Sequence, residues 1–153
     1  MKSNRGITLT SLIIYVIGIT IMITLVVTIT GYFDQNINEV TIQNLAQEQH
    51  TRFVSYLTKD INSENITYVK TANSNNNYII IYFDDGKEHQ YVYNEGTIFF
   101  INIEDDAVTK KIALCTDVTV NSESVFEFDA NKISYNFKIN SEEFSGSYNV
   151  NIK

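Results

Sequence analysis

The first 33 residues of this 153-residue chain differ from the rest in their pattern of apolar and polar positions. After a short basic head, the 27 residues from Ile7 to Phe33 carry no charged side chain. About 20 apolar residues in a helix cross the hydrocarbon core of a bilayer, whereas the apolar core of a secretory signal is only about 7 to 15 residues. The pattern therefore predicts a membrane-spanning helix rather than a secretory signal.

The helix is expected to continue beyond the span. Neither glycine nor proline occurs between Tyr32 and Asn62, so nothing in the sequence interrupts it. Apolar side chains recur there mostly at spacings of three and four, namely at Phe33, Ile37, Val40, Leu45, Phe53, Leu57 and Ile61. We therefore predict one helix with a transmembrane half, residues 7–33, and an amphipathic half, residues 34–62, which packs on the C-terminal part of the chain.

From residue 63 onward the pattern changes to short apolar runs and period-two alternation, both typical of strands. Glycine turns at Gly86 and Gly96 separate successive runs and predict hairpins. The expected strands are Ile66–Lys70, Tyr78–Phe83, Glu88–Tyr93, Thr97–Ile103, Lys111–Val120, Val125–Phe128, Ile133–Ile139 and Tyr148–Ile152. The predicted fold class is α+β, in which the long N-terminal helix packs on an antiparallel β-sheet head, residues 63–153.

Threonines are unusually frequent in the span, and Thr20, Thr24 and Thr28 recur every four residues along one stripe. Two interpretations are open. Their hydroxyls can bond back to carbonyls of their own helix. Alternatively, the stripe forms a close-packing face against another transmembrane helix, with Gly18 or Gly31 helping.

The distribution of charged residues predicts on which side of the membrane each end of the chain lies, and which class of partner is disfavoured. Lys2 and Arg5 precede the span, and Asp34 and Glu39 follow it, so the positive-inside rule places the N-terminus in the cytoplasm and the head outside. The chain carries −7, and without those two basic residues the remainder carries −7 − 2 = −9. This acidic remainder of the chain disfavours direct contact with nucleic acid.

Candidate chemistry beyond the membrane span is sparse. His50, His89 and Cys115 lack the spacing of a zinc site, and we interpret them as separate core or solvent residues. The single cysteine excludes an intramolecular disulfide and leaves pairing between chains open. The acidic runs at Glu104, Asp105 and Asp106 and at Asp84 and Asp85 have no EF-hand spacing, so solvated loops are favoured over calcium binding. We expect neither a cofactor nor catalysis.

At the N-terminus the residues Lys2-Ser3-Asn4-Arg5-Gly6, followed by the apolar run from Ile7, resemble the class III signal of type IV pilins and pseudopilins. In that family a prepilin peptidase cleaves after the glycine and methylates the new amine. The resemblance implies a leader, residues 1–6, cleavage between Gly6 and Ile7, and N-methylation of Ile7. It also implies three partners: the peptidase, other pilin subunits and a membrane assembly platform.

Two positions depart from the family pattern. The first mature residue is Ile7 where phenylalanine is usual, and the fifth is Ser11 where glutamate is usual. In the family, that glutamate is thought to pair with the N-terminal amine of a neighbouring subunit inside the apolar filament core. Serine carries no charge and cannot form the pair. This departure favours a minor subunit at the filament tip over a repeating building block.

The sequence thus predicts a structural minor subunit of a type IV pilus or pseudopilus, which moves from the cytoplasmic membrane to the cell surface on assembly. The runner-up is an uncleaved single-pass anchor that displays an extracytoplasmic β-rich binding domain. A third hypothesis is a competence-type pseudopilus that serves DNA uptake without touching DNA. A pilus, a type II secretion-like pseudopilus and a competence pseudopilus all remain open.

Overall fold

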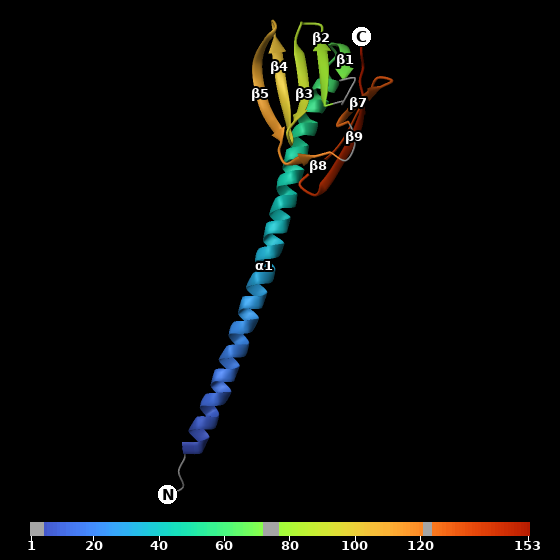
Figure 1. Cartoon of the computed structure of the whole chain (residues 1–153). Helices are drawn as coiled ribbons and strands as arrows, with labels where there is room; N and C mark the ends of the chain where they lie inside the picture. Colours follow the sequence, from blue (N-terminus) through green and yellow to red (C-terminus); the bar gives the residue numbers. More distant parts are fainter. Residues whose placement is uncertain (1–4, 72–76, 121–123) are drawn as a thin grey trace. The chain divides into compact units, whose positions relative to one another are not determined.

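The computed structural model describes residues 5–71, 77–120 and 124–153. Over these residues one helix, α1 (Arg5–Ile61), precedes all the strands (Figure 1). The strands are β1 (Ile66–Thr71), β2 (Tyr78–Phe83), β3 (Glu88–Asn94), β4 (Thr97–Glu104), β5 (Ala107–Cys115), β6 (Val118–Thr119), β7 (Phe126–Asp129), β8 (Lys132–Ile139) and β9 (Glu142–Asn149). The predicted α+β class, a long N-terminal helix followed by antiparallel strands, is confirmed.

The chain divides into two units, one up to Thr41 and one from Ile42 to Lys153. The first unit is the N-terminal part of α1. The helix to which it belongs is long and apolar enough to cross a membrane. Its large apolar side chains are well exposed, from 41% at Ile19 to 68% at Tyr15. This exposure suits a helix that is surrounded by lipid or by other helices, since contact between so much apolar surface and water is unfavourable.

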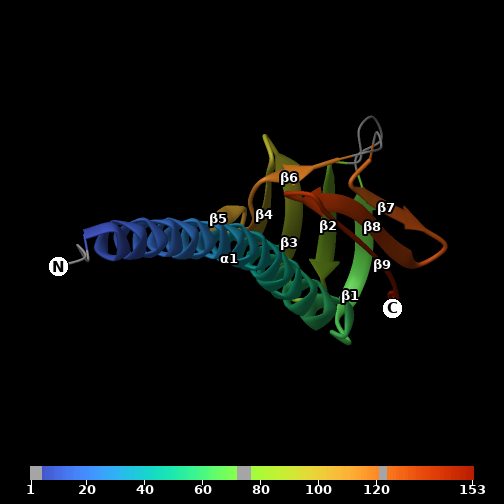
Figure 2. The ribbon, with the colours of Figure 1, turned by 90° about the horizontal axis from the view of Figure 1, so that it is seen from below.

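The second unit contains two antiparallel sheets where the sequence predicted one. Strands β1 to β5 form a meander in chain order. In the other sheet β8 is central: β6 and β7 pair with opposite ends of one edge, and β9 pairs along the other edge. Of this second sheet, β7 lies next to β1 and β2 (Figure 2), and Lys153 N–H donates to Ile66 C=O across the boundary.

Tight two-residue turns connect β3 to β4 and β4 to β5, whereas the loop around Gly86 between β2 and β3 spans residues 84–87. Glu95 and Gly96 have φ of 46° and 77°, as the two central residues of a type I′ turn require. Asp105 and Asp106 connect β4 to β5 in the same way, with φ of 52° and 61°. The predicted hairpins at Gly86 and Gly96 are confirmed, whereas the turn at Asp105 lacks the glycine that would have indicated it.

The predicted strand Lys111–Val120 is two strands, not one. β5 ends at Cys115, Asp117 adopts a φ of 56°, and a separate strand β6 begins at Val118. β5 pairs with β4, but β6 pairs with β8 of the other sheet. Alternating side chains continue across this break, so the sequence pattern does not reveal that the chain changes sheets.

The predicted strand Tyr148–Ile152 is also misplaced. The last strand, β9, is Glu142–Asn149, and Val150 to Lys153 leave the sheet. Gly146 lies inside β9 although glycine usually marks a turn. A Cβ at this position would lie 2.5 Å from the hydroxyl oxygen of Tyr135, its cross-strand partner. The glycine is needed there because the Tyr135 ring covers the backbone.

The core lies where the last turns of α1 meet both sheets. The Phe53 ring contacts the rings of Tyr91, Phe126, Tyr135 and Phe137, with centroids 4.9–6.1 Å apart. The residues of α1 that are buried are Ala46, Gln49, Phe53, Leu57, Asp60 and Ile61. The predicted packing stripe is therefore correct only in its last part, since Phe33, Ile37, Val40 and Leu45 are 49–59% exposed.

Candidate functional site

The residues implied in processing lie at the start of α1. Lys2 falls outside the described residues, and Arg5, Gly6 and Ile7 belong to the first turn of the helix. Ser11 lies one turn further along and is exposed. The helix therefore already includes the Gly6–Ile7 junction. Cleavage there and methylation of Ile7 stay predictions.

The threonine stripe forms hydrogen bonds within its own helix. The hydroxyls of Thr20, Thr24 and Thr28 each donate to the carbonyl four residues earlier, at 2.9 Å. Such bonds satisfy a hydroxyl that would otherwise be costly in hydrocarbon, which supports the first interpretation of the stripe. Side chains added at Gly18 or Gly31 would meet no atom within 4 Å. Packing of this face against another helix remains a prediction.

The acidic loop named as a calcium candidate is a tight turn. Glu104 ends β4 and accepts a hydrogen bond from Asn102 Nδ2 at 3.1 Å, while Asp105 and Asp106 form the turn itself. In the part of the chain that the structure describes, no three His, Cys, Asp or Glu side chains converge as metal ligands. The structure thus adds no support for the calcium interpretation.

His50, His89 and Cys115 occupy separate places. His50 Nε2 lies 2.9 Å from the hydroxyl of Tyr135, and its ring stacks on Phe144 at 4.3 Å. Cys115 is fully buried, and its thiol points to the carbonyl of Gln49 at 3.5 Å. Burial raises the pKa of the Cys115 thiol to about 12, so it stays protonated at neutral pH. A shielded, protonated thiol is poorly suited to a disulfide between chains.

We predict that acid weakens the packing of α1 on β8 and β9 through His50. Burial lowers the pKa of His50 below its ordinary 6.5, so the folded state favours the neutral ring. Its stabilising contribution is present above pH 6.5 and is lost as pH falls from there toward the folded-state pKa, because the unfolded state then binds the proton more readily. Urea midpoints measured between pH 7.5 and 5.5 should fall less for His50→Phe than for the native chain. Equal slopes would contradict the prediction.

A buried polar cluster lies between the end of α1 and β3; we call it the Asp60 cluster and define it as Asp60, His89 and Tyr91. Asp60 is only 6% exposed, and its Oδ2 accepts a hydrogen bond from the Tyr91 hydroxyl at 2.6 Å. His89 Nδ1 lies 2.9 Å from the same oxygen, at ion-pair distance but not aligned for a hydrogen bond. His89 and Tyr91 are two positions apart on β3, so both face the helix. The carboxylate thus has two partners from one strand.

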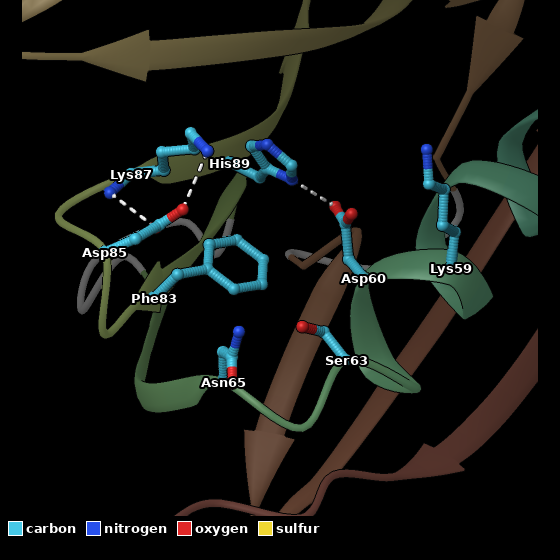
Figure 3. Close-up of a pocket in the computed structure, with 8 residues that line it drawn as sticks. All are labelled: Lys59, Asp60, Ser63, Asn65, Phe83, Asp85, Lys87 and His89. Carbon is cyan, nitrogen blue, oxygen red and sulfur yellow. Dashed lines mark hydrogen bonds and ion pairs between the residues drawn. The ribbon is translucent and has the colours of Figure 1, made fainter.

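Burial, the charge of Asp60 and the hydrogen bond to it all raise the pKa of Tyr91 well above 10. The phenol therefore remains a donor throughout the physiological range. Two hollows, of about 200 and 420 Å³, flank the cluster and share Lys59, Asp60 and His89. Figure 3 shows the smaller one, in which Asp60 and His89 point toward each other and the Asp85–Lys87 pair closes the opposite side.

We predict that Tyr91→Phe lowers the free energy of unfolding of the head by about 1.5–3 kcal/mol, since it removes a buried hydrogen bond to a carboxylate. Tyr93→Phe on the same strand is the control. Its hydroxyl makes only a 3.4 Å contact with Val118 C=O, so the loss should be below about 1 kcal/mol. Urea unfolding followed by circular dichroism measures both, and similar losses would contradict a special role for Asp60.

Sequence reasoning overlooked Asp60 and Tyr91. A signal was present, because Asp60 follows Phe53 and Leu57 at helical spacings of seven and three and so lies on the apolar stripe. A charged side chain on a buried stripe requires a partner. The partner itself, a tyrosine 31 residues further along the chain, could not be inferred from that spacing.

The chain gives no match when it is compared with protein-family models, with curated proteins or with solved structures.

Proposed function

We propose that this chain is a pilin-like structural subunit that assembles through its long apolar helix into a type IV pilus or a pseudopilus. The observation that carries the proposal is the continuity of α1 from Arg5 to Ile61. A single helix includes both an apolar stretch long enough for a membrane and the turns that pack under two antiparallel sheets. The Gly6–Ile7 junction at its start supports processing of the leader.

The mechanism follows from the surface of α1. Before assembly the apolar side chains of the first unit face lipid, and in the filament they face the helices of neighbouring subunits. The exchange costs little, because apolar contacts replace apolar contacts and the threonine hydroxyls keep their own hydrogen bonds. Further along the helix, Phe33, Ile37 and Val40 are also exposed. Two charged residues, Asp34 and Glu39, lie between them, so burying this part of the helix in lipid would be unfavourable. Neighbouring subunits are the better cover.

Intact-mass analysis tests the proposal. The chain is produced with and without a prepilin peptidase, purified from membranes and weighed. With the peptidase, we expect a chain that begins at a methylated Ile7; without it, the full chain from Met1. A chain that retains Met1–Gly6 in both preparations would overturn the pilin-like proposal and leave the uncleaved anchor, which displays the head outside the cell.

We further propose that the subunit is minor and located at the filament tip, because Ser11 cannot offer a carboxylate to the amine of a neighbour. We predict that a labelled native chain marks filament ends only, whereas Ser11→Glu also enters the shaft. Immunogold labelling of isolated filaments measures this, with Ser11→Ala as the control that should stay at the tip. Native subunits along the whole length would show that the tip location is wrong.

A further inference from the structure

The larger of the two hollows, about 420 Å³, lies between the last turns of α1 and strands β3 to β5. We call it the helix-end hollow. A single bridging water takes about 30 Å³, so the space exceeds what one or two waters fill. It falls within the range of about 300–1,000 Å³ that is usual for small-molecule sites.

Charge in the helix-end hollow is opposite to that of the protein around it. Lys59 and Lys110 line it, and among the described residues neither ammonium has an ion-pair partner. The one carboxylate in its wall, Asp60, is buried and already contacts Tyr91 and His89. Since the chain beyond Arg5 carries −9, this concentration of unpaired positive charge is a local exception. It favours an anionic ligand.

One wall of the hollow is aromatic. The rings of Tyr56 and Phe100 meet with centroids 4.9 Å apart, and Lys110 Nζ lies 5.8 Å from the centroid of Tyr56. Tyr56 is half-buried, so part of its ring remains available to the hollow. A flat apolar ring face beside an ammonium suits a ligand that has both an apolar face and a negative charge.

A polar group, Asn102, lies two residues beyond Phe100 on β4. Asn102 Nδ2 donates to Glu104, which leaves Oδ1 as the acceptor of that amide. Oδ1 is buried, and no described protein group donates to it. A buried carbonyl without a donor is unfavourable, and the Asn102 side chain lines the hollow, so a ligand hydroxyl would be stabilised when this side chain turns Oδ1 toward it. Asn102 lies opposite His89 in the β3–β4 register, on the strand face that lines the hollow.

We propose that the helix-end hollow binds an acidic sugar. The carboxylate of the sugar pairs with Lys59 and Lys110, and the C–H face of its ring packs on Tyr56. A ring hydroxyl donates to Asn102 Oδ1 after the Asn102 side chain has turned into the hollow. The proposal goes beyond assembly, because a filament subunit and an anchored domain would display this site equally. It uses no residue of the processing junction.

The test uses the full chain in lipid nanodiscs, which avoids detergents with sugar head groups. Saturation-transfer NMR detects binding of D-glucuronate, with D-glucose and acetate as separate probes. We expect glucuronate to bind at least tenfold more tightly than either, because glucose lacks the charge and acetate lacks the ring. Lys110→Gln and Tyr56→Leu should each weaken glucuronate binding tenfold or more. Lys132→Gln, an exposed lysine on β8, should leave it unchanged.

Each other outcome overturns the proposal. No transfer to glucuronate at millimolar concentration would mean that the hollow is not a sugar site. If glucose bound as tightly as glucuronate, the lysines would have no role in recognition. If acetate bound as tightly as glucuronate, the hollow would be a general anion site. An equal effect of Lys132→Gln would show that overall surface charge, and not the hollow, controls binding. The ligand comparisons use the native chain, so they stand even if a variant folds poorly.

Discussion

Phe53→Ala is expected to lower the free energy of unfolding of the head by about 3–5 kcal/mol. Phe53 is fully buried, and its ring contacts aromatic rings on β3, β7 and β8. Truncation leaves a cavity at the point where α1 meets both sheets, and the large rigid rings around it have little room to collapse inward. Urea denaturation of the chain in nanodiscs, followed by the circular dichroism of the strands, measures the change.

Leu57→Ala and Leu45→Ala are a matched pair that tests which face of α1 packs on the sheets. Both substitutions delete the same atoms from the same helix, one at a buried position and the other at an exposed position. Leu57 is fully buried and should cost about 2–5 kcal/mol. Leu45 is 49% exposed, and its replacement should change stability by less than about 0.5 kcal/mol. Comparable losses at both leucines would mean that α1 packs on the sheets through a different face from the one described.

Gly6→Leu is expected to abolish removal of the leader, which makes it the largest functional effect that we predict. In the family that this N-terminus resembles, the peptidase cleaves directly after glycine, and a branched side chain at that residue would crowd the scissile bond. Intact mass should then show a chain that starts at Met1, and isolated filaments should contain none of it. Unfolding of the head should be unchanged, because residue 6 lies in the other unit.

Asn4→Ala is the control for this variant, since it alters the leader without touching the junction. It should be processed like the native chain. If Gly6→Leu is cleaved normally, the peptidase does not recognise this junction, and the pilin-like proposal fails with it. Sugar binding in the helix-end hollow would be unaffected by that result, so the two proposals can fail separately.

The Asp60 cluster has a structural consequence for the end of α1. A carboxylate in the last turn of a helix opposes the helix dipole, and here it is also buried. Tyr91 and His89 compensate for both effects, but only if the helix end sits at one position along β3. We therefore expect the cluster to contribute more to the register of α1 on the sheet than to overall stability.

Local pattern in the sequence determined much of this protein. The apolar run from Ile7 to Phe33, together with the absence of proline and of any glycine between Tyr32 and Asn62, predicts the length of the helix, because helix formation depends on neighbours three and four residues apart. The hairpins around Gly86 and Gly96 follow for the same reason, since backbone freedom within a few residues makes the turn. The Gly6–Ile7 junction is likewise a pattern of adjacent residues, and its cleavage stays a prediction.

The tertiary structure decided the features that depend on distant partners. Leu45 and Leu57 look alike in the sequence, and only the position of the sheets buries one and exposes the other. Alternation continues through Asp117, yet the chain changes sheets there because β6 pairs with β8 instead of β4. The Asp60 cluster and the helix-end hollow are formed by α1 and strands that lie much later in the chain. Periodicity shows that a side chain needs a partner, but only the packed fold supplies one.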